Sequence, residues 1–184
     1  MDLDYWNVED IITESQRLPC VFNVDVPGLG YLEDSGEADM HKHARVELAY
    51  WMAHFNIVTI QQPRAYGPRV RSALDASPVA VQLRTLLPHW YAMGIRLAQL
   101  LDSEDLRAAL YKTYMGRLAR IYELSILLAG SRSSASEIAA KSSDPTLTTE
   151  MQAFLQGLDD SETALLSAGQ VACRTMQAYL TDSN

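Results

Sequence analysis

The most extended hydrophobic pattern along the chain covers residues 103–128 and repeats with the period of an α-helix. Ser103 is a favourable N-cap, and Glu104 and Asp105 place negative charge at the positive end of the helix dipole. The side chains that fall on one side of this predicted helix are Leu106, Leu110, Tyr114, Leu118, Ile121, Leu124 and Leu128. The pattern therefore predicts one long helix that packs along most of its length.

The apolar surface of this predicted helix is wider than a single contact requires. The side chains that continue it around the helix are Tyr111, Met115, Ala119, Tyr122 and Ile126. The polar remainder is mainly Lys112, Thr113, Arg120 and Glu123. A helix on the outside of a monomer needs an apolar arc of roughly 100°, and this arc is about twice as wide. The helix is therefore either the centre of its own bundle, or it packs its own chain on one side and another protein on the other.

Side-chain type divides this arc into an inner and an outer set. Leucine and isoleucine dominate cores, whereas tyrosine and methionine are enriched at protein interfaces. We expect the edge with Leu110, Ile121 and Leu128 to pack within the chain, and the edge with Tyr111, Met115 and Tyr122 to face a partner. The candidate partner interface consists of Tyr111, Met115, Leu118, Tyr122 and Ile126.

The first 62 residues show the short alternating patterns of a small β-rich domain. Asn7 can cap a short helix that ends near Ser15. The further predicted elements are strands at 20–26, 46–48 and 57–60, a turn at 27–30, an extended path at 31–32 and a second short helix at 49–55. Phe22 and Trp51 are expected in the core, so Trp51→Ala should unfold this domain.

Helical patterns separated by proline, glycine and serine fill the rest of the chain. The predicted helices are 69–76, 78–86, 88–101, 103–128 and 148–180, the last as one long helix. The serine-rich residues 130–145 are predicted to be a flexible loop. Asp159, Asp160 and Glu162 are expected on an exposed face of the last helix, as solvated charges.

These patterns predict an α+β fold, mostly α, with a small N-terminal β-rich domain (1–62) followed by a C-terminal antiparallel helical bundle (67–184).

No apolar run approaches the roughly 18 residues of a membrane span. The acidic N-terminus lacks the basic and apolar regions of a secretory signal. Cys20 and Cys173 stand far apart among apolar neighbours, and we expect two buried free thiols in a reducing compartment, the cytosol or nucleus.

Charge is unevenly distributed along the chain. Residues 1–62 hold 11 acidic and 3 basic side chains, residues 63–132 hold 5 acidic and 10 basic, and residues 133–184 hold 7 acidic and 2 basic. Nine of the ten cations in the middle segment are arginines, the cation preferred at protein interfaces. Nucleic-acid binding ranks second to protein binding, because the net charge is −8 and no lysine-rich stripe is present.

Catalytic and metal-binding patterns are weak. His41 and His43 form an H-x-H pair that could bind a metal from a strand, but no third ligand stands at a plausible spacing, so exposed loop histidines are expected. Gly28 and Gly30 lack the third glycine of a dinucleotide-binding loop, and Cys20 has no C-x-x-C partner. We therefore expect no enzymatic activity, no cofactor and no bound metal.

Residues 4–33, DYWNVEDIITESQRLPCVFNVDVPGLGYLE, followed by VELAYWMA at 46–53, resemble the N-terminal domain of the third Psf subunit of the eukaryotic GINS DNA-replication complex. The match rests on Pro19-Cys20, on the Pro-Gly-Leu-Gly-Tyr-Leu run at 27–32 and on the aromatic helix at 48–53.

A looser resemblance continues through 75–78, 88–91 and the final helix, so it covers nearly the whole chain. The chain departs from the family pattern at Ala49, where proline is usual, and at the short connection 54–56. Both departures concern the geometry of the hinge.

The resemblance implies a non-catalytic scaffold subunit of a heterotetramer. The implied partners are the other three GINS subunits, the Mcm helicase ring and a RecJ-like co-activator. The four-subunit complex would brace the ring and the co-activator during DNA replication. The resemblance further implies a nuclear location, no cofactor and no membrane, and it leaves direct DNA contact open. A stand-alone helical regulator that binds a small ligand or peptide is the alternative, and it would be well behaved without unlike partners.

Overall fold

The computed structural model describes residues 7–32, 38–53, 57–130 and 148–182. The chain divides into two compact units, which we describe separately. The N-terminal unit comprises Met1–Gly67 with Arg96–Ser103, and the helical unit comprises Pro68–Ile95 with Glu104–Asn184. Arg96–Ser103 thus groups with the first unit, although the sequence pattern assigns it to the bundle. The predicted domain boundaries at residues 62 and 67 stay a prediction.

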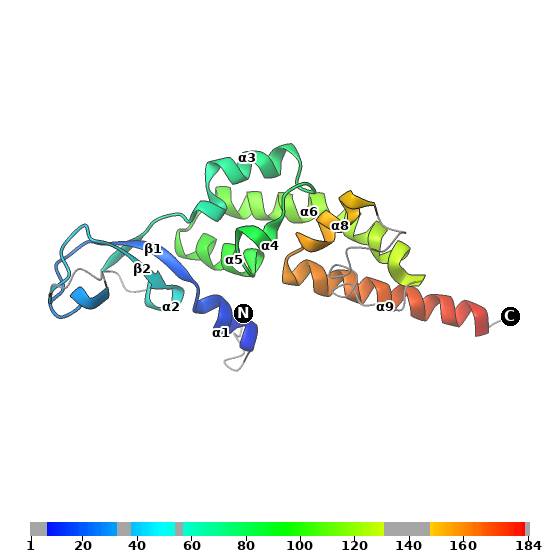
Figure 1. Ribbon diagram of the computed structural model, residues 1–184, viewed down its shortest axis with the longest axis horizontal. Helices are drawn as coiled ribbons and strands as arrows, with labels where there is room; N and C mark the ends of the chain where they lie inside the picture. The colour runs from blue at the N-terminus through cyan, green and yellow to red at the C-terminus, as the bar shows by residue number, and fades with distance from the viewer. Residues whose placement is uncertain (1–6, 33–37, 54–56, 131–147, 183–184) are drawn as a thin grey trace. The chain divides into compact units, whose positions relative to one another are not determined.

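A three-stranded antiparallel sheet with the order β2-β1-β3 forms the N-terminal unit (Figure 1). Its elements in chain order are α1 (Val8–Glu14), β1 (Arg17–Phe22), η1 (Gly30–Leu32), β2 (Arg45–Ala49), α2 (Tyr50–Ala53), β3 (Val58–Ile60) and η2 (Arg64–Tyr66). The central strand β1 directs Leu18, Cys20 and Phe22 to one face, and each is 1% exposed. The side chain of Asn7 caps α1 as predicted, because it accepts a hydrogen bond from the Glu9 N–H at 3.1 Å.

Two details of the predicted β pattern are wrong. The first strand lies at 17–22 instead of 20–26, since Val24 is exposed and Val26 pairs only with Met40, in an isolated bridge. Residues 31–32 belong to the 3-10 helix η1 and are not extended. The chain turns at Gly28, which has a φ of 79° and donates its N–H to the carboxylate of Asp39 at 3.0 Å.

Phe22 is buried as predicted, but Trp51 is 57% exposed, so that prediction is wrong. The single turn of α2 directs Tyr50 and Ala53 inward and leaves Trp51 outside. We expect Phe22→Ala to lower the free energy of unfolding by about 3–5 kcal/mol and Trp51→Ala by only about 0.5 kcal/mol. The rate of amide hydrogen exchange in β1 of both variants measures this difference in stability. An equal increase in the exchange rate of the two variants would contradict the prediction.

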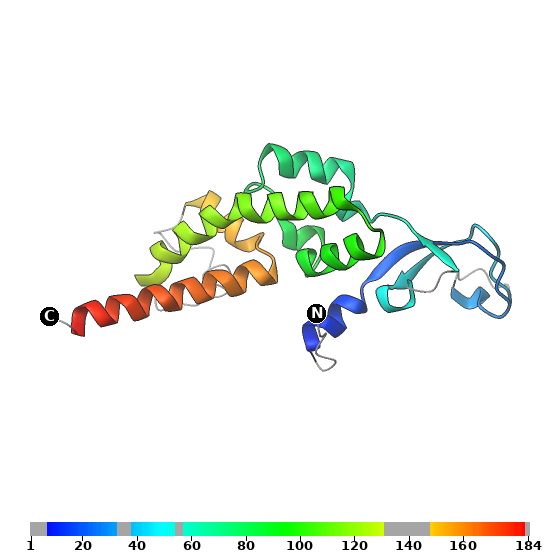
Figure 2. The ribbon, with the colours of Figure 1, turned by 180° about the vertical axis from the view of Figure 1, so that it is seen from behind.

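The helical unit is built around α6, which runs beside α9 (Figures 1 and 2). The elements that follow η2 are α3 (Pro68–Ala76), α4 (Leu83–Leu86), α5 (Trp90–Leu100), α6 (Glu104–Leu127), η3 (Leu128–Gly130), α8 (Thr149–Gln156) and α9 (Asp160–Asp182). The last residues of α5 belong to the N-terminal unit. The predicted fold class, α+β and mostly α, is confirmed. The predicted flexible loop at 130–145 lies, beyond residue 130, outside the described residues.

The helices α6 and α9 are parallel, whereas the sequence predicts an antiparallel bundle. Arg117 pairs with Glu162 in the first turn of α9. Further along both helices, Arg174 donates to the carbonyl of Ala129 at 3.0 Å. Residue numbers therefore increase in the same direction along both helices, and α9 starts beside the middle of α6.

The helix predicted to start at Pro78 starts only at Leu83. The carbonyls of Pro78 and Val81 accept hydrogen bonds from Nη1 of Arg117 at 2.7 and 2.8 Å. In a helix these carbonyls would be engaged by backbone N–H groups. The buried guanidinium of Arg117 replaces these backbone N–H groups as the hydrogen-bond donor, and it holds residues 78–82 as a turn.

The segment predicted as one helix over 148–180 is two helices, α8 and α9, with a break at Gly157, Leu158 and Asp159. A Cβ at Gly157 would lie 2.8 Å from the Cα of Gln82, so this close approach requires glycine. Asp159 then accepts a hydrogen bond from the Ser161 N–H at 3.4 Å and caps α9.

Candidate partner-binding surface and buried ion pair of the helical unit

One side of α6 forms a wall of the hydrophobic core. Ile121, Leu124 and Leu128 belong to a buried cluster with side chains from the segment that contains α8 and the start of α9. Those side chains are Phe154, Leu155, Leu158 and Leu166. Leu110 is 5% exposed. The expectation that Leu110, Ile121 and Leu128 pack within the chain is confirmed.

The far side of α6 presents large apolar side chains to solvent. Tyr111 and Tyr122 are 69% and 66% exposed, Met115 and Ile126 are each 47% exposed, and Leu118 is half-buried. Their spacing places them along one side of the helix. We call Tyr111, Met115, Leu118, Tyr122 and Ile126 the α6 stripe. Their role in partner binding stays a prediction.

A fully buried ion pair joins α6 to α9. Arg117 and Glu162 have 0% of their side-chain surface exposed, and Nε and Nη2 of Arg117 donate to the two carboxylate oxygens at 2.7 and 3.0 Å. Nη2 also donates to the carbonyl of Gly157 at 3.4 Å, so with the two bonds from Nη1 every N–H of the guanidinium has an acceptor. The guanidinium lies 4.7 Å from the ring centre of Phe154, a cation–π contact.

The carboxylate of Glu162 accepts further hydrogen bonds, from the Tyr91 hydroxyl at 2.9 Å and the Asp159 N–H at 3.1 Å. Asp159 in turn accepts from the N–H of Trp90 at 2.7 Å. The network thus fixes the starts of α5 and α9 and the middle of α6 to one another. Because both charges are fully buried and their partners are protein groups, we assign this network to structure and not to catalysis.

The same network predicts a loss of stability at high pH. Burial, and then the negative charge of Glu162, raises the pKa of the Tyr91 hydroxyl above its ordinary value of about 10. The unfolded chain releases this proton first, so the free energy of unfolding should fall by about 1.4 kcal/mol per pH unit above roughly pH 10. Denaturant titrations of the native protein and of Tyr91→Phe between pH 8 and 11.5 measure how the free energy of unfolding depends on pH. Tyr91→Phe should show the shallower slope, and equal slopes would contradict the prediction.

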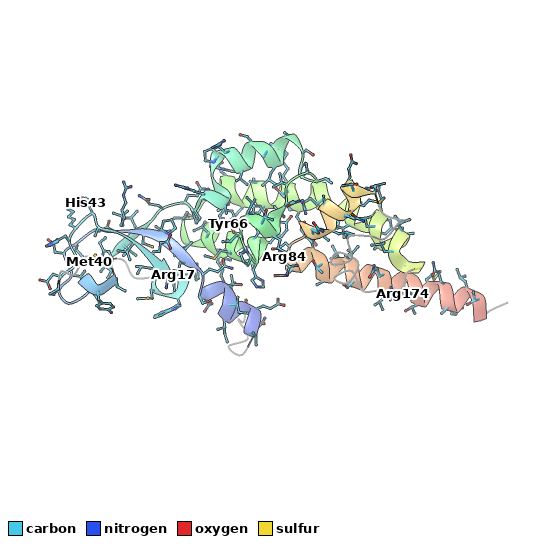
Figure 3. The ribbon with its side chains drawn as sticks, in the orientation of Figure 1. Arg17, Met40, His43, Tyr66, Arg84 and Arg174 are labelled. Atoms are coloured by element: carbon cyan, nitrogen blue, oxygen red, sulfur yellow. The ribbon has the colours of Figure 1, made fainter. Side chains whose placement is uncertain are left out.

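Two acidic residues expected on an exposed helix face are buried, so that prediction is wrong: Asp159 is 2% and Glu162 0% exposed. Asp160 alone is half-exposed, with one carboxylate oxygen 3.1 Å from Nδ1 of His89 and the other 3.9 Å from Nη2 of Arg84. Arg84 is labelled in Figure 3. The sequence did carry a signal. Arg117 and Glu162 each interrupt the apolar side of a helix, and such a position fits either a solvated edge or a buried pair of opposite charges.

The other candidate residues form no chemical site in the described part of the chain. His41 and His43 are exposed, with Nδ1 of His41 3.7 Å from the Asp25 carboxylate, and no described group of three His, Cys, Asp or Glu side chains could hold a metal ion. Both cysteines are free thiols; Cys20 is buried, whereas Cys173 is only half-buried, which corrects that prediction. Among the described helices, none is both long and apolar enough to cross a membrane.

Comparison with known proteins covers both units. The family model described as the PSF3 N-terminal domain matches residues 6–57, and the GINS complex protein helical bundle domain matches residues 65–180. This chain belongs to the PSF3 family of GINS proteins. The PSF3-family resemblance seen in residues 19–20 and 27–32 is thereby confirmed.

Three relatives of this PSF3-family chain match it over nearly its full length. DNA replication complex GINS protein PSF3 from Phaeosphaeria nodorum is 31% identical over 97% of this chain and 96% of its own. The Aspergillus fumigatus protein of the same name is 32% identical over 96% of each chain. The Kluyveromyces lactis protein is 28% identical over 97% of this chain and 98% of its own.

Proposed function

We propose that this PSF3-family chain is a non-catalytic scaffold subunit of the heterotetrameric GINS complex in the nucleus, with the other three GINS subunits as its direct partners. The observation that carries the proposal is the full-length relationship to proteins named DNA replication complex GINS protein PSF3. The α6 stripe supports it, because a row of exposed apolar side chains on a long helix is typical of a protein-binding surface.

We further propose that the complex braces the Mcm helicase ring and a RecJ-like co-activator during DNA replication, with ATP hydrolysis supplied by the ring. In this role the chain contributes interfaces and rigidity. The buried network around Arg117 supports rigidity, because it fixes α6 in place behind the α6 stripe.

Native mass spectrometry after co-expression with the three other GINS subunits of the same species tests the proposal. We expect one copy of each chain in a stable complex, and we expect this chain alone to aggregate through its exposed apolar surface. A monodisperse monomer that ignores the other subunits would contradict the proposal.

The alternative, a stand-alone regulator, has one supporting observation. A cavity of ≈ 590 Å³ in the helical unit is lined by Val79, Gln82, Arg120, Glu150 and Phe154, among others, and is large enough for a small ligand. Full-length kinship with GINS proteins favours the scaffold role. The monodisperse monomer named above is the result that would favour the regulator.

A further inference from the structure

The first helix of the chain is amphipathic in the reverse of the usual sense. A helix normally turns its apolar side inward and its charged side to water. In α1, the acidic residues Asp10 and Glu14, one turn apart, face the largely buried guanidinium of Arg96 within the N-terminal unit. Thr13, on the same side, is 1% exposed.

The outward side of α1 is apolar. Val8, Ile11 and Ile12 are 65%, 52% and 45% exposed, and at the helical period they lie together. We call these three side chains the α1 face. Its direction is fixed by the contacts behind it, since Nη2 of Arg96 donates a charge-assisted hydrogen bond to Asp10 and lies 3.9 Å from a carboxylate oxygen of Glu14.

The sequence around the α1 face is acidic. The first 16 residues contain five acidic side chains and no lysine or arginine. Asp10 and Glu14 pair with Arg96, and Glu9 is exposed at the edge of the α1 face. Asp2 and Asp4 precede the helix in sequence. This charge favours a cationic partner and disfavours nucleic acid and anionic membranes, which carry the same sign of charge.

We propose that the α1 face docks an apolar segment flanked by lysine or arginine side chains on another subunit of the complex. The inference rests on the proposed function, because the partner is one of the other three GINS subunits. The apolar side chains bind the apolar part of that segment, while Glu9 attracts its cations. The contact is distinct from the α6 stripe, which belongs to the other unit.

Hydrogen exchange of residues 8–15 tests the proposal in the full chain, alone and in the co-expressed four-subunit complex. We expect exchange in α1 to slow at least tenfold on assembly. Ile12→Asp should return α1 to the exchange rate of the isolated chain, and Glu9→Lys should reduce the protection several-fold at low salt. Val24→Asp is the matched control, because Val24 is also an exposed aliphatic side chain of the N-terminal unit.

The outcomes separate this inference from the proposed function. A four-subunit complex in which α1 exchanges as fast as in the isolated chain overturns the inference and leaves the function intact. Failure of the native chain to assemble overturns both. If Ile12→Asp alters the circular dichroism of the isolated chain, Val8→Ser is the second variant, and unchanged α1 protection in that variant counts against the inference.

Discussion

Arg117→Ala should remove a large part of the stability of the helical unit. The substitution leaves the carboxylate of Glu162 buried without its cation and leaves the carbonyls of Pro78 and Val81 without their donor. Breaking one partner of a buried ion pair costs about 3–5 kcal/mol, out of a total of about 5–15 kcal/mol for a typical domain. The midpoint of thermal unfolding should therefore fall by about 13–22 °C for a unit of this size, as followed by circular dichroism.

Two variants separate the buried charge from general effects of losing an arginine. Arg120, on the same helix, forms an exposed pair with Glu123 at 2.9 Å, and Arg120→Ala should cost less than about 1 kcal/mol. The double substitution of Arg117→Met with Glu162→Leu removes both buried charges, so it should recover part of the loss. Equal melting temperatures for Arg117→Ala and Arg120→Ala would show that the network carries little stability.

The periodicity of the sequence predicts the elements that a single regular pattern dominates. The helix at 103–128 is found as α6 at Glu104–Leu127, because its apolar positions repeat without proline and its first turn is capped and acidic. The inner set, which includes Leu110 and Ile121, is buried because the same regular repeat places these side chains on one side of the helix. Periodicity therefore finds both the long helix and its core-facing side.

Features that depend on contacts between distant residues could not be predicted in this way. The break in the last helix needs the close approach of Gly157 to Gln82, and the late start of α4 needs the guanidinium of Arg117. Neither contact leaves a local pattern in the sequence. A charge inside an apolar stripe, such as Glu162, has two explanations, a solvated edge or a buried pair. Only the partner across the interface decides between them.

The exposure of Trp51 shows a different limit. Large aromatic residues are usually found inside, but a helix of four residues has too few positions to bury all of its side chains. With Tyr50 and Ala53 directed inward, Trp51 lies outside. The role of the α6 stripe likewise needs a partner chain, and a sequence pattern gives only its position on the helix.

Placing charge on the α6 stripe should abolish assembly without unfolding the chain. Met115 and Tyr122 are 47% and 66% exposed, so Met115→Glu combined with Tyr122→Glu should change the free energy of unfolding by only about 1 kcal/mol. At a stable interface the same charges would be buried without partners, which costs several kcal/mol each, and obligate interfaces bury about 2,000 Å² or more. We expect co-purification with the three other GINS subunits to fall at least a hundredfold.

Lys112→Glu is the matched control for this double variant. It reverses a charge on the same helix, outside the α6 stripe, and breaks only an exposed pair with Asp75 at 2.7 Å. Such a pair contributes about 0–1 kcal/mol, so this variant should assemble as the native chain does. Circular dichroism at 222 nm should be the same for all three proteins. A double variant that keeps this signal and still assembles would show that the partner subunits bind elsewhere, because no close-packed apolar interface accommodates two unpaired carboxylates.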